Sequence, residues 1–407
     1  MPRSKRPGPG LSRKTLAPMR LVHTSDWHLG RTLHGESLLA HQAAFLAWLL
    51  AESVSHQADA VVVAGDIYDR AVPSTDAVTL LDRTLRDFAA ARIPVILTSG
   101  NHDSAVRLGF GARLSELAGI HLRTSVGDIA RPVVLSDADG EVAIYGIPYL
   151  LPDAVMDELS AQRSHHSVLT AAVARIRADA AQRGIGRTVV AAHAFITGAV
   201  PTDSERDIRV GGIGDAPASL FGGVTYAALG HLHGQQNIAA GVTGTTVRYS
   251  GSPLAFSFSE RNQAKSVTLA DIDAAGQVTT TKLAAPVPRP LREVRGKIDD
   301  LLARADGDLA DLAAAWVKVV LTDTIRPASP MERLREKWPH TLVLDFAPEG
   351  GLIGTEADLG RLAAEMADPV KICGHFVEFA SGGPPDAAQR GVLRDAIETC
   401  QHAETAA

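Results

Sequence analysis

The first two-thirds of the chain alternate short apolar, β-branched runs with longer stretches of helical period. The runs have the length of typical strands and carry few polar residues, which is typical of strands buried in a layered α/β domain. Two helices are predicted over residues 35–56 and 74–91. The predicted strands are "MRLVHT" (19–24), "DAVVVAG" (59–65), "IPVILTSG" (93–100), "VAIYGIP" (142–148), "RTVVAAH" (187–193), "TYAALGH" (225–231), "VRYSG" (247–251) and "KSVTLADI" (265–272).

A proline-rich segment, "APVPRPLREV" at residues 285–294, ends this series and predicts a domain boundary. The pattern beyond it predicts a small α/β domain, in which no polar cluster has catalytic spacing. We interpret residues 287–367 as a recognition or capping module. Its predicted elements are a helix near 298–305, a strand at 315–322, a helix at 330–338 and a strand at 341–346.

The last segment, residues 368–407, predicts two short amphipathic helices on either side of "SGGPP". Asp368 and Pro369 have the residue types of a helix N-cap and first turn. Each helix must bury its apolar stripe, either on the chain's own body or on an external partner. The stripes are Ile372, Cys373, Phe376, Val377 and Ala380, followed by Val392, Leu393, Ala396, Ile397 and Cys400.

Composition narrows the class of protein. The chain has 407 residues, 45% of them hydrophobic, which is enough for two or three domains. No apolar run approaches the roughly 18 residues that a membrane span needs, so no membrane association is expected. The two cysteines are too few for a disulfide framework, and they fit a reducing cytoplasm.

Charge is distributed unevenly along the chain. Residues 1–19 are basic and rich in Pro and Gly without the apolar core of a secretory signal, which predicts a disordered tail, with Met19 as an alternative start. Six Lys or Arg lie in the first 20 residues, leaving 34 basic against 46 acidic residues in the remainder. An acidic body argues against a stand-alone nucleic-acid binder, so any DNA contact needs a local patch, a metal site or a partner's surface.

Metal-ligating residue types follow five of the predicted strands. Ligand sites gather at the carboxyl ends of strands in α/β folds, so we expect these residues to converge on a polynuclear site. Two pairs have i, i+2 spacing, which in an extended backbone points both side chains to one face. The residues are Asp26 and His28 in "TSDWHLG", Asp66 and Asp69 in "AGDIYD", Asn101, His102 and Asp103 in "GNHDS", His193 in "VVAAHA", and His231 and His233 in "LGHLHG".

The ligand types indicate the metal. Carboxylates, imidazoles and one amide without a thiolate suit Mn²⁺, Fe²⁺ or Zn²⁺, with Mn²⁺ preferred. Asp66 stands alone on a central strand and is the candidate to bridge two ions about 3.5–4 Å apart. A single His at a strand end is usually an ordinary polar residue, so the hypothesis depends on all five strand ends together. Histidines outside this context, such as His23 and His34, are expected to be structural or exposed.

The motifs "DWH", "GDIYD", "GNHD" and "GHLH", in this order, resemble the calcineurin-like metallophosphoesterase superfamily. That resemblance implies an αββα sandwich with a dinuclear metal centre at its strand ends. The segments "HTSDWHLGRTLHG", "GNHDSAVRL", "SERDIRVGG", "YAALGHLHGQQ" and "YSGSPLAFSFSE" are more specifically similar to the SbcD family of bacterial double-strand-break repair nucleases. The likeness implies a phosphoesterase domain over residues 20–286, a capping domain, and paired helices that dock on the coiled coil of an SbcC-type ATPase.

The same resemblance implies the roles of the site residues. His102 would lie off the metals as a proton donor or transition-state stabiliser, and Asp103 would orient His102 or its loop. The cofactors would be two divalent ions, with Mn preferred and Mg, Fe or Zn as alternatives. The implied ligands are Asp26, His28, Asp66 and His233 for one metal, and Asp66, Asn101, His193 and His231 for the other.

The implied function is a metal-dependent DNA nuclease, both exonuclease and endonuclease, that acts on double-strand ends and hairpins. The partners would be DNA and the SbcC-type ATPase in a heterotetramer, in the cytoplasm and associated with the nucleoid. A homodimer is also implied, and we expect it to form through helices near residues 36–56 and 76–90. These helices carry apolar residues that simple core packing would also explain, namely Leu38, Phe45, Trp48, Leu49, Leu80, Leu81 and Leu85.

The alternative is a calcineurin-like phosphodiesterase or phosphatase for a small or protein substrate. "GDIYDR" partly matches the "GDxVDRG" of protein Ser/Thr phosphatases, but Ala71 stands in place of the glycine and "GNHD" in place of "GNHE". A small cyclic-nucleotide phosphodiesterase would leave the long segment after Pro286 without a use. A scaffold with a vestigial site is disfavoured, because every expected ligand is present.

Overall fold

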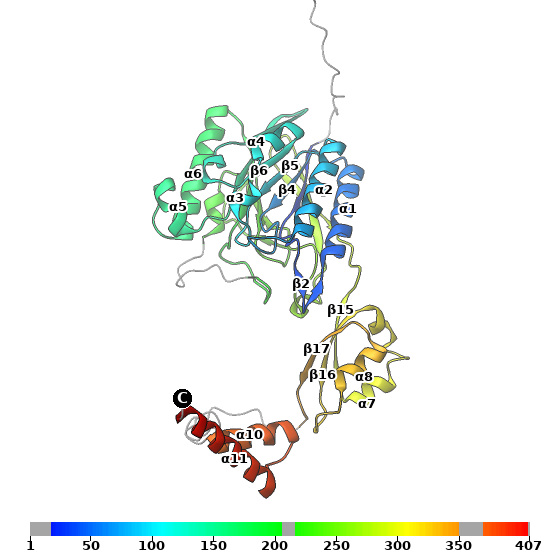
Figure 1. The fold of residues 1–407 in the computed structure, drawn as a ribbon. Helices are drawn as coiled ribbons and strands as arrows, with labels where there is room; N and C mark the ends of the chain where they lie inside the picture. Colours follow the sequence, from blue (N-terminus) through cyan, green and yellow to red (C-terminus); the bar gives the residue numbers. More distant parts are fainter. Residues whose placement is uncertain (1–17, 206–215, 350–368, 406–407) are drawn as a thin grey trace, which may run out of the picture. The chain divides into compact units, whose positions relative to one another are not determined.

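The computed structural model describes residues 18–205, 216–349 and 369–405 (Figure 1). The chain divides into two compact units, Met1–Pro288 and Arg289–Ala407. Among the helices within the described residues, none is both long enough and apolar enough to cross a membrane.

Two six-stranded sheets form the body of the first unit. In the first sheet, the central strands β1, β4 and β5 run parallel, and β13 and β14 extend it with antiparallel pairing. β1 begins at Met19, which is buried, so the predicted tail ends one residue earlier than expected. The strand order is β14 (Val278–Ala284), β13 (Ser266–Ile272), β1 (Met19–Thr24), β4 (Ala60–Ala64), β5 (Val95–Thr98) and β6 (Ile120–Arg123).

The second sheet repeats this arrangement. Its strands β12, β10, β9 and β8 are parallel, and β11 and β7 close its two edges with antiparallel pairs. All eight predicted strands are therefore present, four in each sheet. The order is β11 (Gln236–Ile238), β12 (Thr246–Tyr249), β10 (Tyr226–Gly230), β9 (Arg187–His193), β8 (Gly140–Ile147) and β7 (Val133–Asp137).

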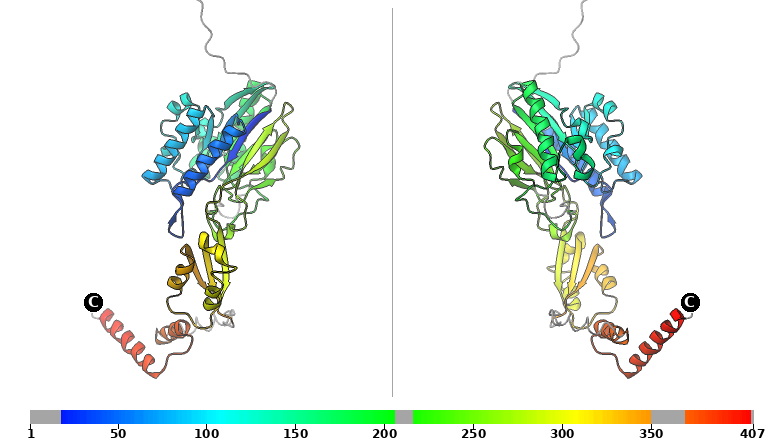
Figure 2. Two further views of the ribbon diagram at one scale, coloured as in Figure 1. Left: turned by 90° about the vertical axis from the view of Figure 1, so that its right-hand side faces the viewer. Right: turned by 90° about the vertical axis from the view of Figure 1, so that its left-hand side faces the viewer.

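Alternate residues of each central strand face different apolar layers. In β4, Ala60 and Val62 face the core between the sheets, whereas Val61 and Val63 face the outer helices. Because both faces of the strand are covered, it has no polar position to alternate with. The outer layers are α1 (Leu39–Ser55) and α2 (Thr75–Ala91) on one side, and α5 (Pro152–Leu159) and α6 (His165–Arg183) on the other (Figure 2). These layers confirm the predicted αββα sandwich.

The helix α2 shows how the sequence produces this packing. Ser74 caps its start by accepting a hydrogen bond from the Ala77 backbone N–H, and Leu81 and Phe88 recur on its buried face. The apolar residues assigned to a dimer surface on α1 and α2 pack instead within the unit. Phe45, Leu49 and Leu81 belong to its core, Leu38 is buried, and Trp48, Leu80 and Leu85 pack against that core. Core packing on the sheet face beneath these two helices therefore accounts for most of these residues, and the dimer surface itself stays a prediction.

Shorter elements complete the first unit. A small antiparallel pair of strands follows the first strand, and two short helices follow "GNHDS". Their bounds are β2 (Thr32–Leu33), β3 (Glu36–Ser37), α3 (Ala105–Leu108) and α4 (Ala112–Ser115).

The second unit contains a parallel three-stranded sheet, β15–β16–β17. β15 begins inside the segment that we predicted as a boundary, because the prolines there all precede Leu291 and leave the strand's backbone N–H groups free to pair with β16. Leu301, Val319 and Trp338 are at the centre of the core. The bounds are β15 (Leu291–Gly296), α7 (Ile298–Ala303), β16 (Trp316–Leu321), α8 (Pro330–Lys337) and β17 (Thr341–Phe346).

The unit ends in two helices that contact each other, α10 (Pro369–Ser381) and α11 (Ala387–Thr405). The proposed N-cap, Asp368, and the side chain of Cys400 lie outside the described residues. Cys373, Val377, Leu393 and Ile397 are half-buried, but part of each apolar face is open. The exposed large apolar residues of the pair are Ile372, Phe376, Phe379 and Val392.

Candidate metal centre

The candidate residues meet where the carboxyl ends of β1, β4, β5, β9 and β10 converge. Hydrogen bonds join these ends across the two sheets. The backbone N–H of His231, after β10, donates to Asp26 Oδ1, after β1, at 3.0 Å. The backbone N–H of Asp26 donates to the carbonyl of Gly65, after β4, at 3.1 Å. The predicted convergence is therefore present in the fold.

The local backbone differs from the expectation of extended pairs. Asp26, His28, Asp66 and His231 have φ of 53°, 45°, 50° and 103°, so the chain turns sharply as soon as each strand ends. An i, i+2 spacing in an extended strand is therefore the wrong reason for the convergence. Left-handed conformations cost energy in residues other than glycine, and such residues cluster at functional sites.

Glycines precede three of the candidate ligands because there is no room for a side chain. A Cβ on Gly230 would lie 1.8 Å from the carbonyl oxygen of Ala64, and one on Gly100 would lie 2.1 Å from Asp66 Oδ1. The "GN" and "GH" dipeptides thus allow neighbouring strand ends to approach closely.

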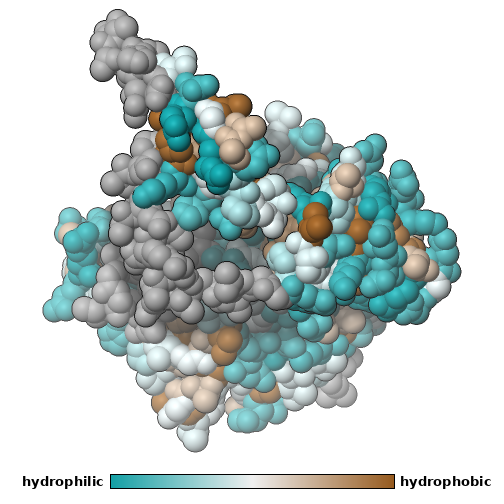
Figure 3. All heavy atoms as spheres, turned by 90° about the horizontal axis from the view of Figure 1, so that it is seen from below, coloured by the Kyte–Doolittle hydropathy of each residue, from teal (hydrophilic) through white to brown (hydrophobic). Residues whose placement is uncertain are grey.

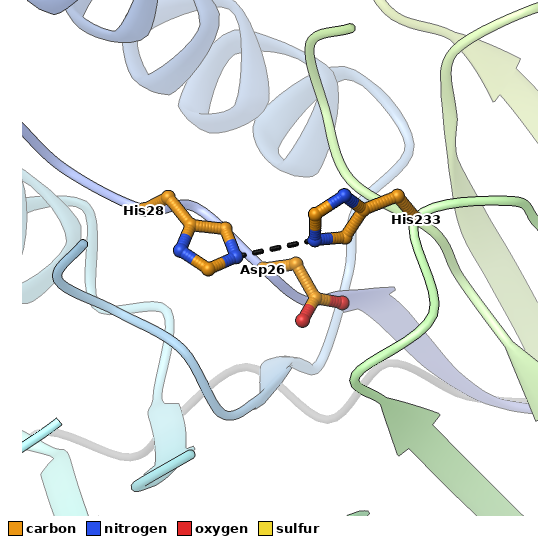
Figure 4. A group of neighbouring side chains, drawn as sticks. All are labelled: Asp26, His28 and His233. Atoms are coloured by element: carbon orange, nitrogen blue, oxygen red, sulfur yellow. Dashed lines mark hydrogen bonds between the residues drawn. The ribbon is translucent and has the colours of Figure 1, made fainter. Parts of the chain in front are cut away.

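Three groups of side chains bring their potential ligand atoms within 4.8 Å of one another. Figure 4 shows the first group, in which Asp26 and His28 from one loop face His233 from another. His28 Nε2 and His233 Nε2 lie 3.2 Å apart. The groups are Asp26, His28 and His233; Asp26, Asp66 and His193; and His28, Asp69 and His102.

Asp26 belongs to both of the first two groups, and Asp66, a member of the second, also approaches His28 of the first. Asp66 Oδ2 is 3.5 Å from His28 Nε2 and 3.4 Å from His193 Nε2, and Asp66 Oδ1 accepts a hydrogen bond from the His102 backbone N–H at 2.9 Å. Asn101 lies beside this pair, with its Oδ1 2.9 Å from His193 Nε2. One carboxylate thus contacts residues from three strand ends.

His231 is placed differently from the other predicted ligands. It is buried, and its ring lies edge-on to that of His193 at 5.3 Å between centroids, but it joins none of the three groups among the described residues. Asp69, which we named among the strand-end residues but gave no ligand role, lies within the third group, with its Oδ1 3.5 Å from His28 Nδ1.

Hydrogen bonds to carbonyl groups determine which imidazole nitrogens are available. His193 Nδ1 lies 3.0 Å from the Ala64 carbonyl oxygen, and His102 Nδ1 lies 2.8 Å from that of Asp69. A carbonyl oxygen can only accept, so Nδ1 carries the proton in both rings and Nε2 is left to face the site. The buried Nδ1 of His28 has no hydrogen-bond partner among the described residues.

Asp103 links two of the loops. Its carboxylate accepts backbone hydrogen bonds from Ile67, Tyr68 and Gly100 at 3.0, 2.8 and 2.9 Å. Burial, together with the charge of Asp66, raises the pKa of Asp103 to about 7. All of these contacts are with backbone, which favours a positioning role over direct contact with a substrate.

The electrostatics of the cluster fit a bound cation. Burial and the neighbouring charge of Asp66 raise the pKa of Asp26 well above its ordinary range. Burial lowers the pKa of His28 and of His193, so these imidazoles are neutral and present lone pairs. Buried carboxylates beside neutral imidazoles need compensating positive charge. The donor set of carboxylate, imidazole and amide oxygen, without thiolate, suits a divalent ion such as Mn²⁺ or Zn²⁺.

The structure also shows partners of His233 that the sequence did not assign. Ser204 Oγ lies 2.5 Å from His233 Nδ1, Glu205 accepts the His233 backbone N–H at 2.7 Å, and Glu260 and Lys265 lie behind them. Ser204, Glu205 and Glu260 lie in "SERDIRVGG" and "YSGSPLAFSFSE", and the resemblance of these segments to the SbcD family is the sequence signal that could have pointed to them. Residues 206–215 lie outside the described part of the chain.

Comparison with known proteins shows the family of the chain. A family model described as calcineurin-like phosphoesterase matches residues 19–235, and one described as type 5 capsule protein repressor C-terminal domain matches 287–370. The SbcD component of the SbcCD nuclease from Staphylococcus saprophyticus is 30% identical over 334 residues, which are 80% of this chain and 84% of that protein. Its namesake from Staphylococcus epidermidis is 30% identical over 338 residues, 80% of this chain and 85% of that protein. Among solved structures, a dimetal phosphatase from Danio rerio covers 65% of this chain and 99% of its own at 13% identity, with a TM-score of 0.39.

Proposed function

Because the chain belongs to the calcineurin-like phosphoesterases and, within them, to the SbcD nucleases, we propose that it hydrolyses DNA phosphodiester bonds at the cluster around Asp66. The chain is a metal-dependent hydrolase of phosphodiester bonds. The single observation that supports this cluster as the active site is the convergence of buried carboxylates and imidazoles from five strand ends.

We assign the ligands to two divalent ions, with Mn²⁺ preferred. Asp26, His28, Asp66 and His233 hold one ion, and Asp66, Asn101, His193 and His231 hold the other. The position of Asp66 Oδ2, 3.5 Å from His28 Nε2 and 3.4 Å from His193 Nε2, supports its role as the shared carboxylate. Two bound cations would neutralise the phosphate oxygens and lower the pKa of a water that attacks in line.

His102 supplies the proton chemistry in this proposal. It is nearly buried and its ring lies edge-on to His28, with centroids 4.6 Å apart, so it is beside the ligands. Its Nδ1–H is held by the Asp69 carbonyl, so Nε2 is the atom that faces the reaction; with a second proton taken up there, the imidazolium would deliver that proton from Nε2 to the departing oxygen and return to the Nδ1–H form. Asp103 holds the loop that carries His102 against residues 66–68.

Arginines beside this end of the site supply a local basic patch. Arg31 contacts Asp69 at 3.4 Å, and the Arg107 guanidinium donates to the Ala71 carbonyl at 3.4 Å. The side chain of Arg70, between them in sequence, is 80% exposed. Contacts of this kind with phosphates would offset the acidity of the remaining chain.

The substrates and the partner complete the proposal. We propose exonuclease and endonuclease action on double-strand ends and hairpins, with an SbcC-type ATPase bound to α10 and α11 and with residues 287–367 as the capping module. Phe376 and Phe379 are 68% and 84% exposed, which fits helix-in-groove recognition. In Figure 3, brown hydrophobic patches interrupt a face that is otherwise mostly hydrophilic.

We retain the homodimer but move its surface. Among the described residues of the first unit, the most exposed large apolar side chains lie on and beside the short helices α3 and α4, namely Val106, Phe110, Leu114 and Leu117, at 85%, 88%, 74% and 88%. Clusters of this kind mark interaction sites. Leu114→Glu should convert a dimer to a monomer in sedimentation at micromolar concentration, whereas Val54→Glu on α1 should not. A dimer that persists in Leu114→Glu would contradict this surface.

Linear and hairpin DNA incubated with the purified chain tests the proposed function. We expect cleavage that requires added Mn²⁺ and changes on addition of the ATPase. A cyclic nucleotide and a phosphopeptide serve as competing substrates. Rapid hydrolysis of either, with intact DNA, would favour the alternative phosphodiesterase or phosphatase. The resemblance to SbcD nucleases over 80% of the chain argues against that outcome.

A further inference from the structure

A line of polar side chains extends from His233 away from the candidate metal centre. His233 Nδ1 lies 2.5 Å from Ser204 Oγ, and Ser204 Oγ lies 2.5 Å from Glu260 Oε1. The other oxygen of Glu260 accepts from Lys265 Nζ. Glu260 is fully buried and Lys265 is 5% exposed, so this ion pair is almost wholly removed from water.

The direction of each hydrogen bond follows from counting protons. Lys265 is a donor, and its further acceptors are Gln263 Oε1, Ser252 Oγ and the His233 carbonyl, at 2.9, 3.0 and 3.1 Å. Glu260 is held ionised by this ammonium group and can only accept, so the one hydroxyl proton of Ser204 must point to Glu260. Ser204 Oγ can then only accept from the ring, so in the singly protonated ring that a metal ligand requires, the proton of His233 is on Nδ1.

A competing arrangement would point the Ser204 proton at Thr202 Oγ1, 3.0 Å away. That arrangement would leave the Ser204 lone pairs facing the Glu260 carboxylate at 2.5 Å. Thr202 Oγ1 donates its own proton to Glu205 Oε2 at 2.6 Å. The shorter, charge-assisted contact with Glu260 is therefore the stronger one.

The tautomer determines what the other ring nitrogen, His233 Nε2, can bind. With the proton on Nδ1, His233 Nε2 presents a lone pair toward His28 and Asp26, as a metal ligand must. His193 and His102 reach the same state through backbone carbonyls. His233 differs from these two because side chains determine its tautomer.

We propose that Ser204, Glu260 and Lys265 are positioning residues that hold His233 in its Nδ1–H tautomer and thereby set the cation affinity of the group formed by Asp26, His28 and His233. The proposal deepens the proposed function and rests on its metal centre. Partners of this kind behind a metal-ligating histidine typically affect metal affinity about 10–100-fold when they are removed.

Ser204→Ala is the primary test. Ser204 is half-buried, so the substitution removes the hydroxyl without opening the core. Mn²⁺ titration by calorimetry should show one site weakened about 10–100-fold and the other unchanged. Ser204→Thr, which keeps a hydroxyl, should restore the affinity. Ser259→Ala is the matched control, because the exposed Ser259 contacts Ser257 and not His233.

A second measurement reports the tautomer without metal. In metal-free protein labelled with ¹⁵N-histidine, the His233 signals, identified by their loss in His233→Gln, should show Nδ1–H in the wild type and a shift toward Nε2–H in Ser204→Ala. An unchanged tautomer together with unchanged Mn²⁺ affinity in Ser204→Ala would overturn the proposal. A wild-type protein that binds no Mn²⁺ would instead overturn the metal centre, while the tautomer spectra would still decide the role of Ser204.

Discussion

The first unit buries titratable side chains at one end of its two sheets, whereas the second unit exposes apolar side chains on its last two helices. Asp26, His28 and Asp66 are at most 2% exposed, but Phe376 and Phe379 are 68% and 84% exposed. Within the described part of the second unit, the buried polar side chains are those of Thr322 and Thr341. Buried charge must be neutralised, and exposed apolar surface must be covered. The difference supports our proposal that the first unit carries the catalytic site and the last two helices carry the docking surface.

We expect the largest effect from a substitution that removes the shared carboxylate of Asp66. Asp66→Asn should abolish Mn²⁺-dependent DNA cleavage and lose both ions, since the Asp66 carboxylate approaches proposed ligands of both ions, His28 and His193. Ligand binding to the native state raises the melting temperature, so Mn²⁺ should stabilise the wild type and not this variant. Asp82→Asn, on the exposed face of α2, is the control. Two tightly bound ions in Asp66→Asn, measured by metal analysis, would refute the bridging role.

His102→Ala should affect catalysis and spare binding. General acid catalysis is typically worth roughly 10²–10⁴-fold in rate, which sets the expected fall in turnover. Metal content and DNA affinity should stay near wild type, because the proposed ligand set omits His102. Metal stoichiometry, DNA binding and cleavage are best measured on one preparation. Loss of one equivalent of metal would make His102 a ligand, as its position in the third group allows, and cleavage within threefold of wild type would leave it no catalytic role.

A substitution in the second unit should weaken partner binding and leave catalysis unchanged. Phe376→Glu combined with Phe379→Glu should weaken co-purification with the ATPase by tens-fold or more, since buried aromatic anchors often contribute about 2 kcal/mol or more. Cleavage of a small phosphodiester should not change. Glu378→Gln, on the same helix, is the control. Undiminished capture of the ATPase would show that α10 is not its docking surface.

Elements with a continuous or strongly periodic apolar pattern could be predicted from sequence. β4 is an example of the continuous pattern, because both of its faces are buried. α2 is an example of the periodic pattern, because a single face of the helix is buried. β14 was missed, since its "VTTTKLA" lies at a sheet edge with alternate residues exposed. α6 was not predicted, although it buries residues from Val168 to Ala180. Its apolar positions are mostly alanines interspersed with arginines, which gives a weak pattern.

The ligand types of the site could be predicted, but not its supporting contacts. Strand-end motifs point to Asp66 and His193 because Asp66 lies two residues after the buried strand β4 and His193 is the last residue of the buried strand β9. Ser204 and Glu260 reach His233 from loops 29 and 27 residues away in sequence, and no spacing rule connects them. Asp69 was quoted with its motif, yet only the fold shows it beside His28.

The smallest expected effect concerns a buried charge that the chain neutralises by itself. Arg123 is 2% exposed and pairs with Glu116 at 2.6 Å, as does Arg131. The hydrogen bond from Arg131, with further help from Arg123, lowers the pKa of Glu116 to about 2 from its ordinary 4.5. A carboxyl group with a depressed pKa in the folded state stabilises the fold above about pH 4.5, and that contribution is lost as the pH falls toward 2.

Glu116→Gln should therefore lower the stability at pH 7 by about 1–3 kcal/mol, measured by urea unfolding, because it leaves Arg123 without its ionised partner. The difference from wild type should shrink between pH 4.5 and 2. The rise in melting temperature with Mn²⁺ should be the same in both proteins, since this pair needs no cation. A Glu116→Gln variant whose difference from wild type stays constant down to pH 2 would show that the ion pair contributes nothing to stability.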